Sequence, residues 1–91
     1  RQYSFDRAFM GSCGIDMMDH TVTTLGVEDG LTKKAAIESS RHKYAVMERE
    51  KFYFNESYKF TQLDELDGII TDEFPDQSVQ DMLDSLGVTL Y

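Results

Sequence analysis

Two glycines near the start of the chain enclose the segment best suited to bind a ligand. Gly11 and Gly14 flank Ser12 and Cys13, directly after an apolar run that ends at Met10. When such a loop follows the carboxyl end of a strand, its backbone amides can donate hydrogen bonds to an anion or a hydroxyl group. The segment therefore predicts one wall of a small anion-binding site.

Lysines at two later places could supply the positive charge that an anion needs. Lys33 and Lys34 lie on a predicted helix, and Lys51 lies in a charged, aromatic loop. Each candidate also has a purely structural interpretation. The glycines of residues 11–14 could serve only a tight turn, Cys13 could fill space, and the lysines could lie in solvent. Both interpretations stay open on the sequence alone.

Other site chemistry has little support in the composition. Cys13 is the single cysteine, and neither His20 nor His42 belongs to a recognisable nucleophile motif. A zinc site would need more cysteine and histidine than the chain offers. A single cysteine also excludes an internal disulfide and is typical of a reduced, cytoplasmic protein. We therefore expect no catalytic residues, no metal and no cofactor.

The charge of the chain is unevenly distributed. All nine Lys and Arg and nine of the seventeen Asp and Glu lie in residues 1–59, whereas residues 60–91 hold eight acidic residues and no basic one. Phosphate backbones need a concentrated basic face, so direct binding of nucleic acid is disfavoured. The sequence also shows no signal peptide and no apolar run of membrane-spanning length.

Strand and helix patterns alternate along the 91 residues, which suffice for one small domain. Asp76 is a candidate amino-terminal cap and Gly87 a candidate carboxyl-terminal cap for the last helix. The alternation predicts an α/β fold with a mostly parallel sheet and flanking helices. We expect strands at 8–10, 44–47, 58–61, 67–72 and 88–91, helices at 29–42 and 77–86, a helical turn at 63–66, and loops at 16–27 and 48–57.

Ligands of parallel sheets bind at the carboxyl ends of the strands. Three places in the chain meet that description, namely residues 11–14, residues 48–51 and Asp72. We therefore expect these three places to lie near one another, although Asp72 could equally end its strand and cap the next turn.

At these residues the chain resembles the C-terminal effector-sensing domain of DeoR-family bacterial transcriptional regulators. The resemblance runs in order over nearly the whole chain. One departure is Glu48-Arg49-Glu50, which stands where the family has Asp-x-Ser. The matching elements are Gly11-Ser12-Cys13-Gly14-Ile15-Asp16, Thr23-Thr24, Glu28-Asp29, Lys33, Lys51-Phe52 and Leu66-Asp67-Gly68-Ile69-Ile70-Thr71-Asp72.

The resemblance implies that residues 1–91 are the second half of an effector-binding sensor domain with a partial ribose-5-phosphate isomerase-like fold. It implies a phosphorylated sugar effector held by Gly11, Ser12, Cys13, Gly14, Lys33 and Lys51. It also implies that DNA is bound only through a winged helix-turn-helix domain absent from this chain. The strands of this half would normally pair with strands of the first half, which is not present here. Their sheet would then have an open edge, so we expect association into a homo-oligomer.

The related isomerase carries a catalytic aspartate in the loop where this chain has Cys13. Sugar-phosphate isomerisation needs a carboxylate base, and a neutral thiol replaces it poorly. The preferred interpretation is thus a non-catalytic sensor of a transcriptional regulator of sugar metabolism, and we expect that regulator to be a repressor. The alternative is a protein-interaction or oligomerisation module, and a sugar-phosphate isomerase is the least favoured.

Overall fold

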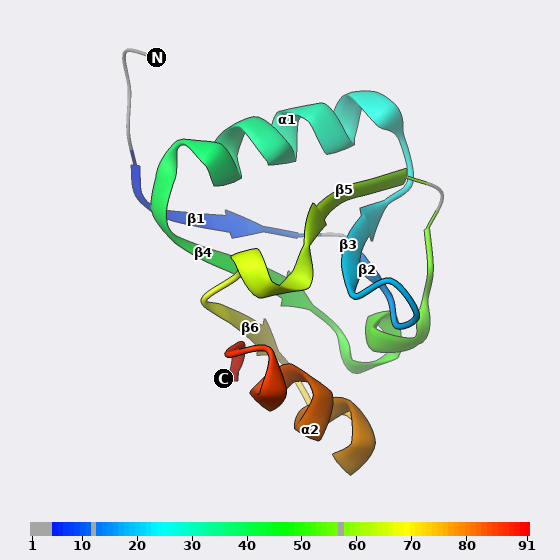
Figure 1. Ribbon diagram of the computed structural model, residues 1–91. Helices are drawn as coiled ribbons and strands as arrows, with labels where there is room; N and C mark the ends of the chain where they lie inside the picture. Colours follow the sequence, from blue (N-terminus) through cyan, green and yellow to red (C-terminus); the bar gives the residue numbers. More distant parts are fainter. Residues whose placement is uncertain (1–4, 12, 57) are drawn as a thin grey trace.

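Two β-sheets of different kinds share one core in this computed structural model, which describes residues 5–11, 13–56 and 58–91 (Figure 1). In Figure 1, α1 runs along β1 at one end of the molecule, and α2 lies at the other end beyond β6. The elements in chain order are β1 (Phe5–Met10), β2 (Gly14–Asp16), β3 (Thr21–Thr24), α1 (Val27–Glu38), β4 (Ser40–Met47), the 3₁₀ helix η1 (Arg49–Tyr53), β5 (Tyr58–Gln62), the 3₁₀ helix η2 (Leu63–Glu65), β6 (Gly68–Thr71), α2 (Gln77–Ser85) and β7 (Thr89–Leu90).

The larger sheet is parallel throughout, in the order β1-β4-β6-β7. Its register places Met10 beside Ala45, and Ala45 beside Ile69. The predicted parallel α/β architecture is confirmed. Because every strand runs the same way, the segments that follow β1, β4 and β6 emerge at one edge of the sheet.

The smaller sheet is antiparallel, in the order β2-β3-β5, and the sequence analysis did not predict it. The expectation of a loop at 16–27 was wrong, because β3 lies there and all four of its residues are buried. Three of those residues are threonines, whose branched side chains suit a strand. Burial on both faces removes the alternating pattern by which a strand is usually recognised.

The first helix begins and ends earlier than predicted. It spans Val27–Glu38, whereas residues 29–42 were expected. Ser39 and Ser40 follow, and their hydroxyls donate to the carbonyls of Ala35 and Ala36 at 2.8 and 2.6 Å. Such side-chain bonds compete with continued helix. The chain then turns into β4, whose first residue pairs with β1, so residues 40–42, which were expected to end the helix, lie on a strand.

The second helix agrees closely with its prediction. Val79 and Leu83 are buried, and α2 ends in a Schellman motif around Gly87, which has φ 78°. The amide of Val88 donates to the carbonyl of Leu83 at 2.9 Å, as that motif requires. Asp76 occupies the amino-terminal cap position, but its side chain makes no capping hydrogen bond, so that part of the prediction was wrong.

The core lies on one face of the parallel sheet. Ala45, Met47 and Ile69 point into a buried cluster that also takes in Ile37 from α1 and Leu83 from α2. Residues that alternate with them on the strands must point to the opposite face. That face carries large exposed side chains, among them Phe9, Val46 and Tyr91.

Candidate binding site at the carboxyl ends of the parallel strands

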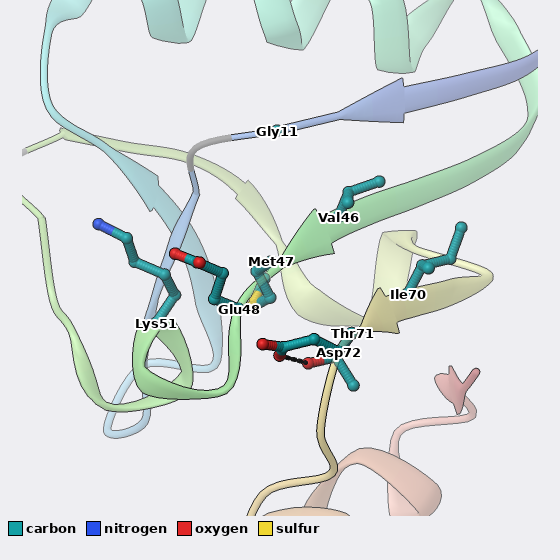
Figure 2. A pocket seen from close by; sticks show the side chains of 8 residues that line it. All are labelled: Gly11, Val46, Met47, Glu48, Lys51, Ile70, Thr71 and Asp72. Carbon is teal, nitrogen blue, oxygen red and sulfur yellow. Dashed lines mark hydrogen bonds between the residues drawn. The ribbon is translucent and has the colours of Figure 1, made fainter.

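A pocket of about 540 Å³ lies where β1, β4 and β6 end (Figure 2). The three strand ends singled out in the sequence therefore meet, as expected. Figure 2 shows Glu48 and Lys51 on the turn after β4, and Asp72 on the segment after β6. The lining residues are Gly11, Val46, Met47, Glu48, Lys51, Ile70, Thr71 and Asp72.

The residues of the Gly-x-x-Gly loop have different surroundings. Gly11 lines the pocket, and a side chain added there would meet no atom within 4 Å. Cys13 is fully buried in the core, with its Sγ 3.4 Å from the carbonyl oxygen of Gly11, and it does not line the pocket. Ser12 lies outside the described residues.

Gly14 is the first residue of β2 and is buried away from the pocket. A Cβ at this position would collide with the backbone carbonyl of Phe54 and lie 3.0 Å from Oγ1 of Thr23. The next amide, that of Ile15, donates to the same Phe54 carbonyl at 2.7 Å. Gly14 thus permits the chain after η1 to approach β2 closely, which is a structural requirement.

Lys51 is the lysine that lines the pocket. Its Nζ lies 3.7 Å from a carboxylate oxygen of Glu56 and 5.0 Å from the ring centre of Phe54. The side chain is 30% exposed, so its ammonium can still reach a ligand from this position. A ligand anion would share that charge with Glu56.

Lys33 lies elsewhere. It belongs to α1, and its Nζ is 3.4 Å from Oγ1 of Thr24, a residue of β3. Lys33 is not among the residues that line the pocket. The structure therefore brings together Gly11 and Lys51 of the predicted set, and it leaves Cys13, Gly14 and Lys33 outside the lining.

Two carboxylates on the pocket wall were absent from the predicted site residues. Glu48 is exposed at the start of the turn after β4, and Asp72 is exposed just beyond β6. Oγ1 of Thr71 donates to Oδ1 of Asp72 at 3.3 Å, which orients that carboxylate. Their position directly after an apolar strand pattern had marked both as strand-end residues, but neither was named as a ligand contact.

A second cluster of charges closes the β2–β3 hairpin, and its residues are not among those that line the pocket. Oδ1 of Asp16 accepts the amides of Met18 and Asp19 at 2.9 and 3.1 Å, and its Oδ2 lies 3.2 Å from Nζ of Lys59. The Asp19 amide is the main cause of a lowered pKa of Asp16. The pKa of Lys59 is raised, chiefly by its hydrogen bond to Asp19.

Within the part of the chain that the structure describes, no three His, Cys, Asp or Glu side chains gather as a metal site would require. The same residues include no helix with the length and apolar character that crossing a bilayer demands.

Comparison with known proteins gives a consistent result. Residues 1–73 match the family described as DeoR C terminal sensor domain. The chain is 34% identical over 88 residues to the HTH-type transcriptional repressor GlcR of Bacillus subtilis (strain 168), covering 97% of this chain and 33% of that protein. It is 32% identical over 82 residues to proteins named Glycerol-3-phosphate regulon repressor from Escherichia coli (strain K12) and Shigella flexneri, covering 90% of this chain and 32% of each. The chain thus spans about a third of the length of these relatives.

Proposed function

The chain belongs to the DeoR C-terminal sensor domain family, and on that premise we propose that it is the ligand-sensing part of a transcriptional repressor of sugar metabolism. A phosphorylated sugar or related metabolite binds in the pocket and controls DNA binding by a separate winged helix-turn-helix domain. The relatives named as repressors support the regulatory role. The pocket at the strand ends is the observation that carries the sensing role. A cytoplasmic location accompanies this function.

The ligand contacts follow from the chemistry of the pocket wall. Lys51 pairs with an anionic group, and such a charge-assisted hydrogen bond contributes on the order of 1–3 kcal/mol. Glu48 and Asp72 would repel a phosphate but can accept hydrogen bonds from sugar hydroxyls. The hydroxyl-bearing part of the ligand therefore faces these two carboxylates, and its phosphate lies away from them.

Further contacts of the proposed set come from the Gly-x-x-Gly loop and from α1. The proposed contacts include backbone donors at Gly11, Ser12, Cys13 and Gly14. Gly11, which lines the pocket, is the best supported of the four, whereas the other three rest on their place in the sequence. Lys33 remains in the proposal as a second cation, although only its sequence position supports that role.

Binding occurs without turnover in this proposal. Cys13 occupies the position at which the related isomerase has a carboxylate, and its thiol is buried in the core. A buried thiol is a poor base for moving a proton between sugar carbons. The full-length protein is therefore expected not to isomerise ribose 5-phosphate.

The second candidate is an interaction or oligomerisation module, and the exposed face of the parallel sheet favours it. Phe9 and Tyr91 are 58% and 57% exposed, and Tyr44 stacks on Phe9 with ring centres 5.4 Å apart. Parallel sheets are ordinarily covered on both faces. The face therefore supports contact with another part of the protein or with a second copy.

One experiment separates the two candidates. The full-length protein is mixed with a panel of phosphorylated sugars and glycerol 3-phosphate, and its melting temperature and operator affinity are measured. A ligand that stabilises the folded state raises the melting temperature by mass action, and a sensor also changes its operator affinity. If no compound in a broad panel changes either quantity, the interaction module is favoured.

A further inference from the structure

Arg49 lies between the two segments that flank the pocket. It begins η1, the turn that carries Lys51 and directly follows Glu48. The facing segment, residues 72–76, leads from the end of β6 to the start of α2 and begins with Asp72. The spacing of these two segments sets the distance between the walls of the pocket. A side chain that joins them therefore influences the shape of the site.

Three hydrogen bonds of Arg49 reach across to the facing segment. Its backbone amide donates to Oδ1 of Asp72 at 3.0 Å, and its Nε donates to the carbonyl of Phe74 at 3.0 Å. Its Nη2 donates to Oδ1 of Asp76 at 2.8 Å, which is also an ion pair. The guanidinium thus holds two acceptors at once, which its planar shape allows and a lysine ammonium cannot reproduce.

Tyr53, at the other end of η1, completes this connection. The carbon at the centre of the Arg49 guanidinium lies 5.7 Å from the Tyr53 ring centre. The phenolic oxygen of Tyr53 accepts the backbone amide of Asp76 at 3.0 Å. We call the contacts of Arg49 and Tyr53 with residues 72–76 the Arg49 clamp. It explains why Asp76 does not cap α2, since the carboxylate is bound to Arg49 instead.

We propose that Arg49 is a positioning residue for the pocket, which holds the turn carrying Glu48 and Lys51 at a fixed distance from Asp72. The identity of the ligand in this inference rests on the proposed function. A preorganised pocket loses less conformational entropy when a ligand binds, so loosening the clamp weakens binding. The Arg49 side chain is 37% exposed, so its removal leaves the buried core in place.

The first arm of the test needs no ligand. Amide hydrogen exchange is measured on the full-length protein, on Arg49→Ala and on Arg49→Lys. The control is Arg41→Ala, an exposed arginine at the opposite end of β4. Arg49→Ala should raise exchange at least about threefold in both residues 48–54 and residues 72–77, with Arg49→Lys intermediate. Unchanged exchange in either segment would overturn the inference.

The second arm measures affinity for glycerol 3-phosphate and for the sugar phosphates of the panel. Any compound that the unmodified protein binds should bind Arg49→Ala about tenfold more weakly, and Arg41→Ala equally well. Asp76→Ala should also weaken binding, and the double variant should lose little more than Arg49→Ala alone, because both act through one contact. Binding by Arg49→Ala within twofold of the unmodified protein would contradict the proposal, as would fully additive losses.

The two arms separate the possible failures. If the unmodified protein binds none of the compounds, the proposed function fails, and the exchange result alone decides whether Arg49 joins the two segments. If the unmodified protein binds a compound, the affinity result decides whether that connection shapes the site. A melting temperature measured without ligand for every variant shows that each remains folded at the temperature of the titration.

Discussion

At the scale of single residues, the two glycines of the Gly-x-x-Gly loop have separate tasks. Gly11 lies open on the pocket, whereas Gly14 is needed because the Phe54 carbonyl approaches it closely. The sequence could place both glycines in a turn after the first strand. It could not separate their tasks, because Phe54 comes forty residues later and meets Gly14 only in the folded chain.

Alanine substitutions test this separation. Gly14→Ala should lower the free energy of unfolding by about 1–3 kcal/mol, because the added methyl group forces the backbone near Phe54 to move. Gly11→Ala should change it by no more than about 0.5 kcal/mol, since its surroundings are open. Urea denaturation of the full-length protein and of both variants measures the difference. Equal losses in the two variants would show that the close approach at Gly14 is absent.

Lysines show the same limit of sequence reasoning. Lys51 follows a parallel strand, so the strand-end rule placed it at the pocket correctly. Lys33 was proposed as a cation from its place on the predicted helix and from the resemblance, but its ammonium lies 3.4 Å from Oγ1 of Thr24 on β3. Arg49 carried no signal, because its contacts depend on a segment more than twenty residues further along the chain.

At the scale of elements, the sequence predicted those strands and helices whose pattern is local. The predicted parts of the first two parallel strands, residues 8–10 and 44–47, are short apolar runs, and α2 has an apolar stripe followed by Gly87. The end of α1 was missed because Ser40 pairs with β1, a contact that local pattern does not record. β3 was missed because all four of its residues are buried, which removes the alternating pattern, and its pairing with β2 and β5 is not local in sequence.

The β2–β3 hairpin has a predictable pH dependence. The pKa of Asp16 is lowered in the folded protein, chiefly by the Asp19 amide, so the stabilisation by its carboxylate is present above the ordinary pKa of 3.8. That stabilisation is lost as the pH falls through the lowered value. The pKa of Lys59 is raised, so the stabilisation by its ammonium group is present below the ordinary pKa of 10.5. That stabilisation is lost as the pH rises through the raised value.

Asp16→Asn should therefore destabilise the full-length protein at neutral pH, and the deficit should shrink as the pH falls below 3.8. Urea denaturation at a series of pH values measures this, with Asp64→Asn as an exposed aspartate control outside the hairpin. A deficit that stays constant from neutral to acidic pH would contradict the assignment of the Asp16 carboxylate to the hairpin.

At the scale of the whole molecule, the parallel sheet has one covered face and one exposed face. On one side, both helices and the antiparallel sheet pack with the parallel sheet to form the buried core. Phe9, Tyr44 and Tyr91 lie on the other face. The ring centre of Tyr44 is 5.4 Å from that of Phe9 and 6.1 Å from that of Tyr91. β1 is also an edge strand, and such edges invite pairing. An isolated chain of this shape should therefore associate.

Sedimentation equilibrium tests this expectation. Residues 1–91 alone should form a dimer or larger species, and Phe9→Ser with Tyr91→Ser should weaken that association at least about tenfold. The control pair is Tyr53→Ser with Phe74→Ser, which are exposed aromatic residues outside this sheet face. A clean monomer at every concentration would contradict the prediction of a homo-oligomer.

The central claim is that the pocket at the strand ends binds a phosphorylated sugar through Lys51. Calorimetric titration of the full-length protein and of Lys51→Met, with the sugar phosphate that raises the melting temperature most, tests it directly. The control is Lys34→Met, which breaks a similar ion pair with Glu38, of 3.8 Å against 3.7 Å for Lys51 and Glu56. We expect Lys51→Met to bind about tenfold more weakly or worse, and Lys34→Met to bind normally. Equal affinity in all three proteins would contradict the account.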